Sequence, residues 1–170
     1  MNPGYNKVMK IKSLILAGVF MAIASTSAFA DFGVGGQIGF TAGPYYSNFM
    51  SATICSDENP WCLSVDAWPF GNTAAVTADN WFIVKPLSNP VSWYAFWGIS
   101  ANVGWNDFMV GTGARIGAGL DWFILDKRQV ELFCQACWNP YVALRHGDDW
   151  DCILRPLNFP LSTGARYWFR

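Results

Sequence analysis

The sequence has little charge and a single histidine. Of its 170 residues, 14% are charged, 52% are hydrophobic and ten are tryptophan, whereas about 25% of the residues of a soluble domain are charged. We therefore expect part of the surface to face an apolar environment. Enzymes that transfer or hydrolyse acyl groups need a His close to a Ser or a carboxylate. His146 is close to Asp148 but has no His-x-Ser spacing, so we expect no enzymatic activity and no cofactor.

After residue 30 the sequence also lacks an apolar run of about 18 to 20 residues, which a transmembrane helix requires. The residues before that point have the order of a secretory signal peptide. Three lysines precede an apolar run, which small residues follow: Lys7, Lys10 and Lys12, then Leu14 to Ala24, then Ala28-Phe29-Ala30. We predict Sec export, cleavage after Ala30 and a mature domain of residues 31–170. Translation from Met1 or from Met9 gives the same mature domain.

The mature domain is acidic, and its cysteines are few. Eight basic and twelve acidic residues follow Ala30, a net charge of −4, which argues against nucleic acid as a partner. Export permits disulfides, and Cys55 and Cys62 flank a short turn, so we expect a bridge between them. Cys134 and Cys137 have the spacing of a redox or zinc motif. They face opposite sides of a predicted strand, however, which weakens that interpretation.

Two segments show the period-two alternation that is typical of a membrane β-strand. One face of 91–105 is apolar: Val91, Trp93, Ala95, Trp97, Ile99, Ala101, Val103 and Trp105. In 112–122 the corresponding face has Thr112, Ala114, Ile116, Ala118, Leu120 and Trp122. The opposite face of 112–122 is mostly glycine, with Arg115 and Asp121. We expect the apolar faces to meet lipid and the other faces to line a lumen.

Charged side chains on the inner faces predict a polar network inside a narrow barrel. Glycine leaves room for long side chains from neighbouring strands, and Gly113-Ala114-Arg115 recurs as Gly164-Ala165-Arg166. We expect these arginines to pair with inward acidic residues, so that the predicted network is Arg115, Arg166, Glu131, Asp121 and Asp79, with Asp66 as a further candidate. Eight strands enclose about the volume that side chains fill. The network is therefore expected to plug the barrel.

The complete pattern predicts an all-β fold, an eight-stranded antiparallel up-and-down transmembrane β-barrel after the signal peptide. An even number of strands is what a single-chain bacterial barrel requires. The expected strands are 32–40, 48–55, 61–68, 73–85, 91–105, 112–122, 130–138 and 161–169. Short turns rich in Asp, Asn, Pro and Gly separate most of them, one of them Pro86 to Pro90. The one long loop is expected from Arg145 to Pro160.

The glycine-rich first strand, Gly111-Thr112-Gly113-Ala114-Arg115 and the closing Gly164-Ala165-Arg166-Tyr167-Trp168-Phe169 resemble a spirochaete domain-of-unknown-function family of small outer-membrane proteins. The resemblance covers most of the mature domain. It implies an eight-stranded barrel like the membrane domain of OmpA-type proteins, with surface binding of host factors. One departure is Arg170, which follows the aromatic residue on which the barrel-assembly signal usually ends.

These features predict a protein of the outer membrane of a diderm bacterium, in contact with outer-membrane lipid and the barrel-assembly machinery. We expect a structural or surface-interaction role in which the long loop contacts host surface or serum proteins. The predicted contact residues are His146, Asp148, Asp149, Trp150 and Asp151. Three carboxylates without the glycine turn and glutamate of a calcium loop do not predict a metal site. The alternative is a small pore for ions or hydrophobic solutes.

Overall fold

The computed structural model describes residues 31–44, 47–68, 72–105, 108–124, 128–147 and 149–169. The strands in these segments are β1 (Phe32–Ala42), β2 (Ser47–Ser56), β3 (Trp61–Ala67), β4 (Thr73–Ser88), β5 (Val91–Gly104), β6 (Phe108–Ile124), β7 (Val130–Trp138), β8 (Tyr141–His146), β9 (Trp150–Arg155) and β10 (Phe159–Phe169). Helices of the length and apolarity needed to cross a membrane are not found in this part of the chain. The predicted signal peptide, Asp148 and Arg170 lie outside the described residues.

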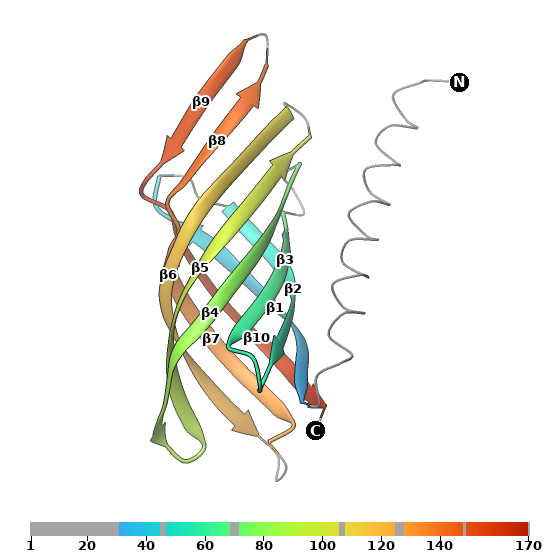
Figure 1. Ribbon diagram of the computed structural model, residues 1–170, viewed down its shortest axis with the longest axis vertical. Helices are drawn as coiled ribbons and strands as arrows, with labels where there is room; N and C mark the ends of the chain where they lie inside the picture. The colour runs from blue at the N-terminus through green and yellow to red at the C-terminus, as the bar shows by residue number, and fades with distance from the viewer. Residues whose placement is uncertain are drawn as a thin grey trace, which may run out of the picture. The chain divides into compact units, whose positions relative to one another are not determined.

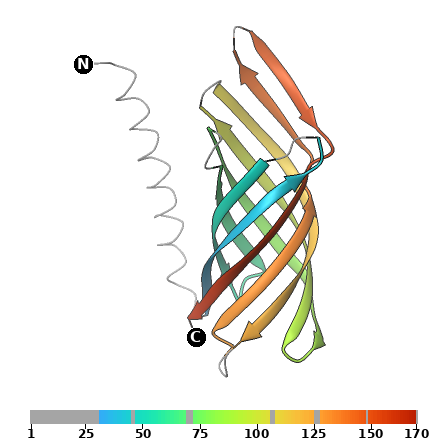
Figure 2. The same ribbon diagram turned by 180° about the vertical axis from the view of Figure 1, so that it is seen from behind.

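Eight of the described strands form a closed antiparallel barrel, as the sequence predicts. Neighbouring strands from β1 to β7 pair in chain order, and β10 closes the ring by pairing with both β7 and β1. The start of β1 and the end of β10 lie side by side at one end, which we call the termini end (Figure 1 and, from behind, Figure 2). Closure leaves the barrel wall without a free strand edge.

The predicted long loop from Arg145 to Pro160 is wrong, because most of this segment forms β-structure. β8 pairs with the first residues of β6, and β9 pairs with β8. The resulting hairpin extends beyond the barrel at the end opposite the termini, which we call the hairpin end (Figure 1). The backbone N–H of Gly147 donates to the backbone oxygen of Asp149, and the backbone of Trp150–Arg155 bonds to β8 instead of to water.

The predicted turn from Pro86 to Pro90 is also shorter than expected. β4 continues to Ser88, and irregular pairing between Pro86 and Ser88 accommodates the proline, which has no N–H for the sheet. Only Asn89 and Pro90 separate β4 from β5.

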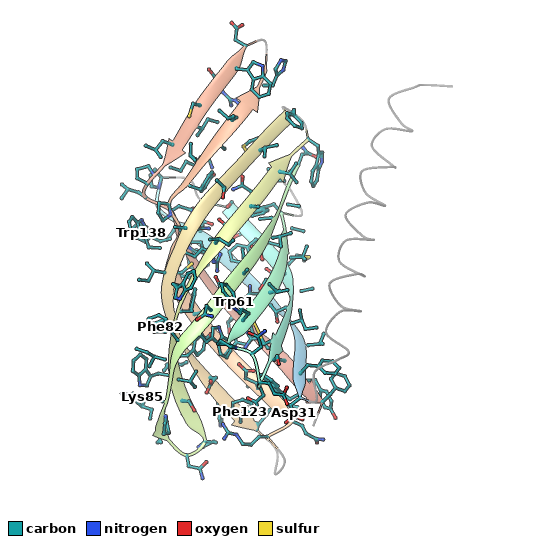
Figure 3. The ribbon with its side chains drawn as sticks, viewed as in Figure 1. Asp31, Trp61, Phe82, Lys85, Phe123 and Trp138 are labelled. Atoms are coloured by element: carbon teal, nitrogen blue, oxygen red, sulfur yellow. A yellow bond between two sulfur atoms is a disulfide. The ribbon has the colours of Figure 1, made fainter. Side chains whose placement is uncertain are left out.

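The faces of the strands are those predicted from the alternation, and the barrel is apolar outside and polar inside. Ile99 is 58% exposed and Trp97 45% exposed on the outer face of β5, whereas the inward Tyr94 and Phe96 are fully buried. Figure 3 shows Trp138 and Phe82 projecting outward from the wall. The buried polar residues lie inside: Gln37, Thr41, Ser51, Thr53, Ser64, Asp66, Thr77, Asp79, Ser92, Ser100, Arg115, Asp121, Glu131, Asn139, Asn158 and Arg166.

Candidate functional site in the barrel lumen

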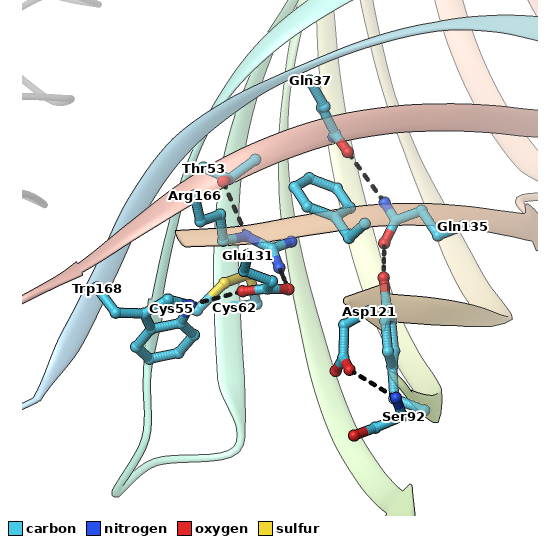
Figure 4. Close-up of polar contacts among 12 residues, drawn as sticks. Gln37, Thr53, Cys55, Cys62, Ser92, Asp121, Glu131, Gln135, Arg166 and Trp168 are labelled. Carbon is cyan, nitrogen blue, oxygen red and sulfur yellow. Dashed lines mark hydrogen bonds and ion pairs between the residues drawn. A yellow bond between two sulfur atoms is a disulfide. The ribbon is translucent and has the colours of Figure 1, made fainter. Parts of the chain in front are cut away.

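The lumen near the termini end is centred on an ion pair between β10 and β7. Arg166 and Glu131 occupy directly opposite positions on these strands, and Nη1 of Arg166 lies 2.5 Å from Oε1 of Glu131. The indole Nε1 of Trp168 donates to the second carboxylate oxygen at 2.7 Å, and Nε of Arg166 donates to the hydroxyl of Thr53 at 3.2 Å (Figure 4). Both charges are therefore buried with hydrogen-bond partners, as burial of an ion pair requires.

Aromatic rings fill the space around this pair. The guanidinium carbon of Arg166 lies 3.7 Å from the ring centre of Phe133 and 5.1 Å from that of Trp81. Trp81 stacks in turn on Tyr94, with 4.3 Å between the ring centres. A cation held against aromatic faces gains electrostatic attraction when water is excluded. These residues, with Glu131, form the part of the lumen that we call the plug.

Glycines on the facing strands make room for the plug. A Cβ atom at Gly33 would lie 2.7 Å from the indole of Trp168, and one at Gly164 would lie 2.6 Å from Cζ of Phe133. Real Cβ atoms do not approach other atoms this closely. The glycines on the inner faces of β1 and β10 are thus the counterpart of the bulky residues on the neighbouring strands, as the sequence predicts for a narrow lumen.

A disulfide joins Cys55 of β2 to Cys62 of β3 inside the barrel. The two residues are opposite one another in the strand register, and both pack against Trp168. The bridge therefore closes the β2–β3 turn next to the plug. Of the other cysteines, Cys134 is exposed and Cys137 is buried on the inner face, so the two side chains of the Cys-x-x-Cys spacing lie on opposite faces of β7.

A second ion pair lies farther from the termini end. Arg115 of β6 holds Asp79 of β4 with two hydrogen bonds, of 2.8 Å from Nε and 3.1 Å from Nη2. Gly98 of β5 stands between these two residues in the register, and its missing side chain lets the arginine reach across one strand. The side chains of both partners are buried.

Asp121 was predicted as one of the acidic residues that pair with an inward arginine, and its hydrogen bond goes to the backbone instead. Its Oδ1 accepts a hydrogen bond of 3.2 Å from the backbone N–H of Ser92, and among the described residues it is in no ion pair within 4.0 Å. The predicted five-residue network is therefore two separate buried ion pairs and a carboxylate that binds the start of β5. Asp121 takes this role because Ser92 is its direct neighbour in the register.

A chain of uncharged polar side chains crosses the lumen between the two pairs, and sequence reasoning did not single it out. Tyr94 donates to Gln135 at 3.1 Å, and Gln135 donates to Gln37 at 3.2 Å (Figure 4). Gln37 in turn donates to Ser51 at 3.3 Å. Ser162 also donates to Gln37, at 3.0 Å. The only available signal was that alternation places each of these residues on an inner face.

Beyond this chain the lumen is hollow toward the hairpin end. The cavity, which we call the vestibule, has a volume of about 300 Å³. Arg115 and Gln135 line its inner part, and Thr41, Ser47 and Thr73, at strand ends, line its outer part. The lumen thus has a filled half and an open half, whereas the sequence predicted a plug without this division.

The predicted surface residues gather at the tip of the β8–β9 hairpin, apart from Asp148, which is outside the described residues. Arg145 and Asp151 form an ion pair of 3.0 Å whose side chains are 44% and 61% exposed. His146 packs edge-on against Trp150, with 4.7 Å between the ring centres. The backbone oxygen of Asp149 accepts a bond from Gly147. Groups of three or more metal-binding side chains are not found in the described segments.

No protein-family model and no curated protein sequence matches the chain. Among solved structures, the chain is similar to the N-terminal β-barrel domain of Pseudomonas aeruginosa OprF, with 17% identity and a TM-score of 0.49 over 81% of this chain and 97% of that one. It is also similar to a major outer membrane protein from Thermus thermophilus, with 14% identity and a TM-score of 0.43 over 82% of this chain and 98% of that one. The predicted spirochaete family stays a prediction.

Proposed function

We propose that the chain is a small integral protein of a bacterial outer membrane. The observation that carries this proposal is the inverted polarity of the barrel, with ion pairs inside and many large apolar side chains exposed on the outer face. Soluble proteins seldom expose apolar patches larger than a few hundred Å², whereas a closed barrel satisfies its backbone groups within a bilayer. Outer-membrane lipid is the environment that such a surface fits, and the barrel-assembly machinery is the expected insertion partner.

Membrane fractionation combined with gel mobility tests this location. We expect the protein in the outer-membrane fraction, with a different mobility before and after heating in detergent, because a closed barrel resists unfolding by detergent alone. A protein that stays in solution without detergent would contradict the proposal.

We further propose that the barrel has a structural or surface-interaction role, and that the β8–β9 hairpin is the contact surface. Short turns of such barrels face the periplasm and longer connections face outward, which supports an exterior position for the hairpin. Trp150 is 60% exposed and Leu154 is 66% exposed on this hairpin. Exposed aromatic residues are typical anchors of protein interfaces, and host surface or serum proteins are the proposed partners.

The contact surface can be tested with variants of the hairpin. We expect Trp150→Ala combined with Leu154→Ala to weaken binding to immobilised serum and extracellular-matrix proteins at least tenfold. The matched control is Leu87→Ala, which removes an equally exposed apolar side chain from β4 near its turn with β5. Equal binding by the hairpin variant and the control would refute the proposed surface.

The alternative function is a small pore, and the vestibule is the observation that favours it. A solute that enters the vestibule meets the plug, in which the ring of Phe133 and the Arg166–Glu131 pair fill the lumen. We therefore favour a barrel that does not conduct. Planar-bilayer recordings distinguish the two functions, since a steady current from folded protein would support the pore.

A further inference from the structure

The β8–β9 hairpin has a free strand edge, which the closed barrel wall lacks. β8 lies between β6 and β9, whereas β9 is the last strand of the sheet and pairs, among the described strands, with β8 alone. Both ribbon views show β9 as the outer strand of the hairpin (Figure 1 and, from behind, Figure 2). The N–H and C=O groups along such an edge are a template for pairing with a further strand.

Two charges restrict which strand can pair with this edge. Proteins protect edges with proline, lysine, bulges and charged side chains, and of these β9 has only the charged side chains of Asp151 and Arg155. Both lie on one face of the strand, with Ile153 midway between them. A neighbouring strand without charges would desolvate them without compensation, which is costly. The edge therefore favours a strand with an arginine opposite Asp151 and an acidic residue opposite Arg155.

A second copy of β9 meets this requirement. In an antiparallel pair centred on Ile153, each Ile153 is opposite the other, so Asp151 of each copy is opposite Arg155 of the other. Opposite charges at directly facing positions stabilise antiparallel strands. On the other face Cys152 of each copy is opposite Leu154 of the other, and both side chains are exposed in the single chain. The two copies thus match in charge on one face and in apolar character on the other.

The contacts that these two charges already make are compatible with this pairing. Asp151 binds Arg145 of β8 through Oδ2 at 3.0 Å, and its side chain is 61% exposed. The guanidinium carbon of Arg155 lies 5.4 Å from the ring centre of Tyr141, its opposite residue on β8. In the pair, Asp151 would lie between Arg145 of its own chain and Arg155 of the second copy. The row of side chains across the paired sheets therefore alternates in charge.

We propose that β9 pairs with β9 of a second copy of this chain, in the antiparallel register centred on Ile153. Such neighbours are related by a two-fold axis perpendicular to the sheet. Because β8 continues the barrel wall through its pairing with β6, this axis is also perpendicular to the barrel axis, and the second barrel points in the opposite direction. The two copies then belong to facing membranes, an arrangement that rests on the proposed exterior position of the hairpin.

Reversal of the two charges tests this register in folded barrel in detergent micelles. In a pair of identical chains, Asp151→Arg gives two facing arginine pairs and Arg155→Asp gives two facing acidic pairs. Like charges directly opposite one another destabilise paired strands, so each variant alone should self-associate about tenfold or more weakly than the unmodified protein. A mixture of the two variants restores an arginine opposite an acidic residue at both positions and should form mixed pairs about as tightly as the unmodified protein does.

Sedimentation equilibrium in density-matched detergent measures these affinities. The matched control is Lys85→Glu, which reverses an exposed charge on β4 and should associate as the unmodified protein does. Heat-modifiable gel mobility verifies that each variant is folded. Recovery in the mixture separates a defect of pairing from a defect of folding, since two misfolded chains would not restore one another.

A cysteine cross-link tests which residues face one another. Directly opposite residues of antiparallel strands have Cα atoms about 4.5 to 5.5 Å apart, which a disulfide can join, whereas diagonal neighbours are about 7 to 8 Å apart. With Cys134, Cys137 and Cys152 replaced by alanine, Ile153→Cys should form a covalent dimer when diamide takes up the two thiol hydrogens. The control retains Ile153 and has Cys152 as its single free thiol. It should cross-link at least about tenfold more slowly, because each Cys152 is diagonal to the other.

Vesicles test the facing arrangement. Phosphatidylcholine vesicles that carry the unmodified barrel should aggregate, which increases the turbidity of the suspension. Vesicles that carry Asp151→Arg and vesicles that carry Arg155→Asp should each stay dispersed and should aggregate when they are mixed. Vesicles without protein are the control for aggregation of the lipid itself.

Four results would overturn the proposal. They are folded protein that stays monomeric at sub-millimolar concentration; charge variants that associate alone as well as the unmodified protein does, or that fail to associate when mixed; faster cross-linking through Cys152 than through Ile153→Cys; and dimers in micelles without aggregation of vesicles. None of them bears on membrane location, which fractionation tests, or on the binding of serum proteins, which the variants of Trp150 and Leu154 test.

Discussion

Removal of either partner of the Arg166–Glu131 pair is expected to destabilise the barrel severely, whereas removal of both is not. Glu131 has no exposed surface and Arg166 is 3% exposed. Breaking a buried ion pair from one side costs about 3 to 5 kcal/mol, because the remaining charge has no compensation. We expect losses of this size for Glu131→Leu and for Arg166→Met separately.

The double variant Glu131→Leu/Arg166→Met removes both charges and keeps the volume of the plug nearly filled. Apolar replacement of a whole buried pair is often neutral or stabilising. Here Nε1 of Trp168 loses its acceptor Glu131, which costs about 1 to 3 kcal/mol for an unsatisfied buried donor. The two single losses would add to roughly 6 to 10 kcal/mol if they were independent. The double variant should therefore show a coupling energy of at least about 3 kcal/mol.

Urea unfolding of the refolded barrel, followed by tryptophan fluorescence and by gel mobility, measures these differences. The control is Asp151→Ala, which breaks the exposed pair with Arg145 and should cost no more than about 1 kcal/mol. A double variant whose loss equals the sum of the single losses would refute the reasoning, because it would mean that the two charges do not compensate one another in the plug.

Three further predictions concern the packing and the permeability of the lumen. Gly117→Val should destabilise the barrel by about 1 to 3 kcal/mol through overpacking, because its Cβ would lie 2.6 Å from Cζ of Phe96; the outward Ala118→Val is the control, and equal unfolding curves for the two would contradict the prediction. Replacement of Cys55 and Cys62 by alanine should cost about 2 to 3 kcal/mol, since the bridge closes a loop with a sequence separation of 7 and short loops gain the least from a disulfide; an unchanged urea midpoint under oxidising conditions would contradict this value. The folded protein should give no steady current in planar bilayers, and a reproducible single-channel conductance would show that the plug does not close the lumen.

The barrel, and which face of each strand points outward, follow from the sequence. In a closed wall, successive residues of a strand face alternately inward and outward, so the apolar set identifies the outer face. Each residue of β5 and β6 faces either inward or outward, and the outward set is apolar except for Thr112. The direct opposition of Arg166 and Glu131 needs only the register of β7 and β10. The faces follow from the period of the alternation, which a sequence records locally, whereas the register that brings Arg166 opposite Glu131 is a relation between two strands that the sequence left open among several acidic residues.

Other features depend on relations between strands that the sequence does not record. Asp79 pairs with Arg115 across β5. Arg115 had several acidic residues as candidate partners, and it reaches Asp79 because the residue between the two on β5 is Gly98. The β8–β9 hairpin was missed for a different reason. Each of its strands has six residues, and both lie beyond the barrel, where the alternation of lipid-facing and lumen-facing residues no longer applies.

The lumen divides into plug and vestibule because the barrel has a constant radius, whereas the size of the inward side chains changes along its length. An eight-stranded barrel has much the same width along its length, so the residues at each level decide whether that level is filled. Near the termini end Tyr94, Phe133 and Trp168 project inward against glycines. At the level of the vestibule the inward residues include Ala75 and Gly111. Conduction would therefore require the plug level to open, and substitutions in the vestibule alone should not produce a pore.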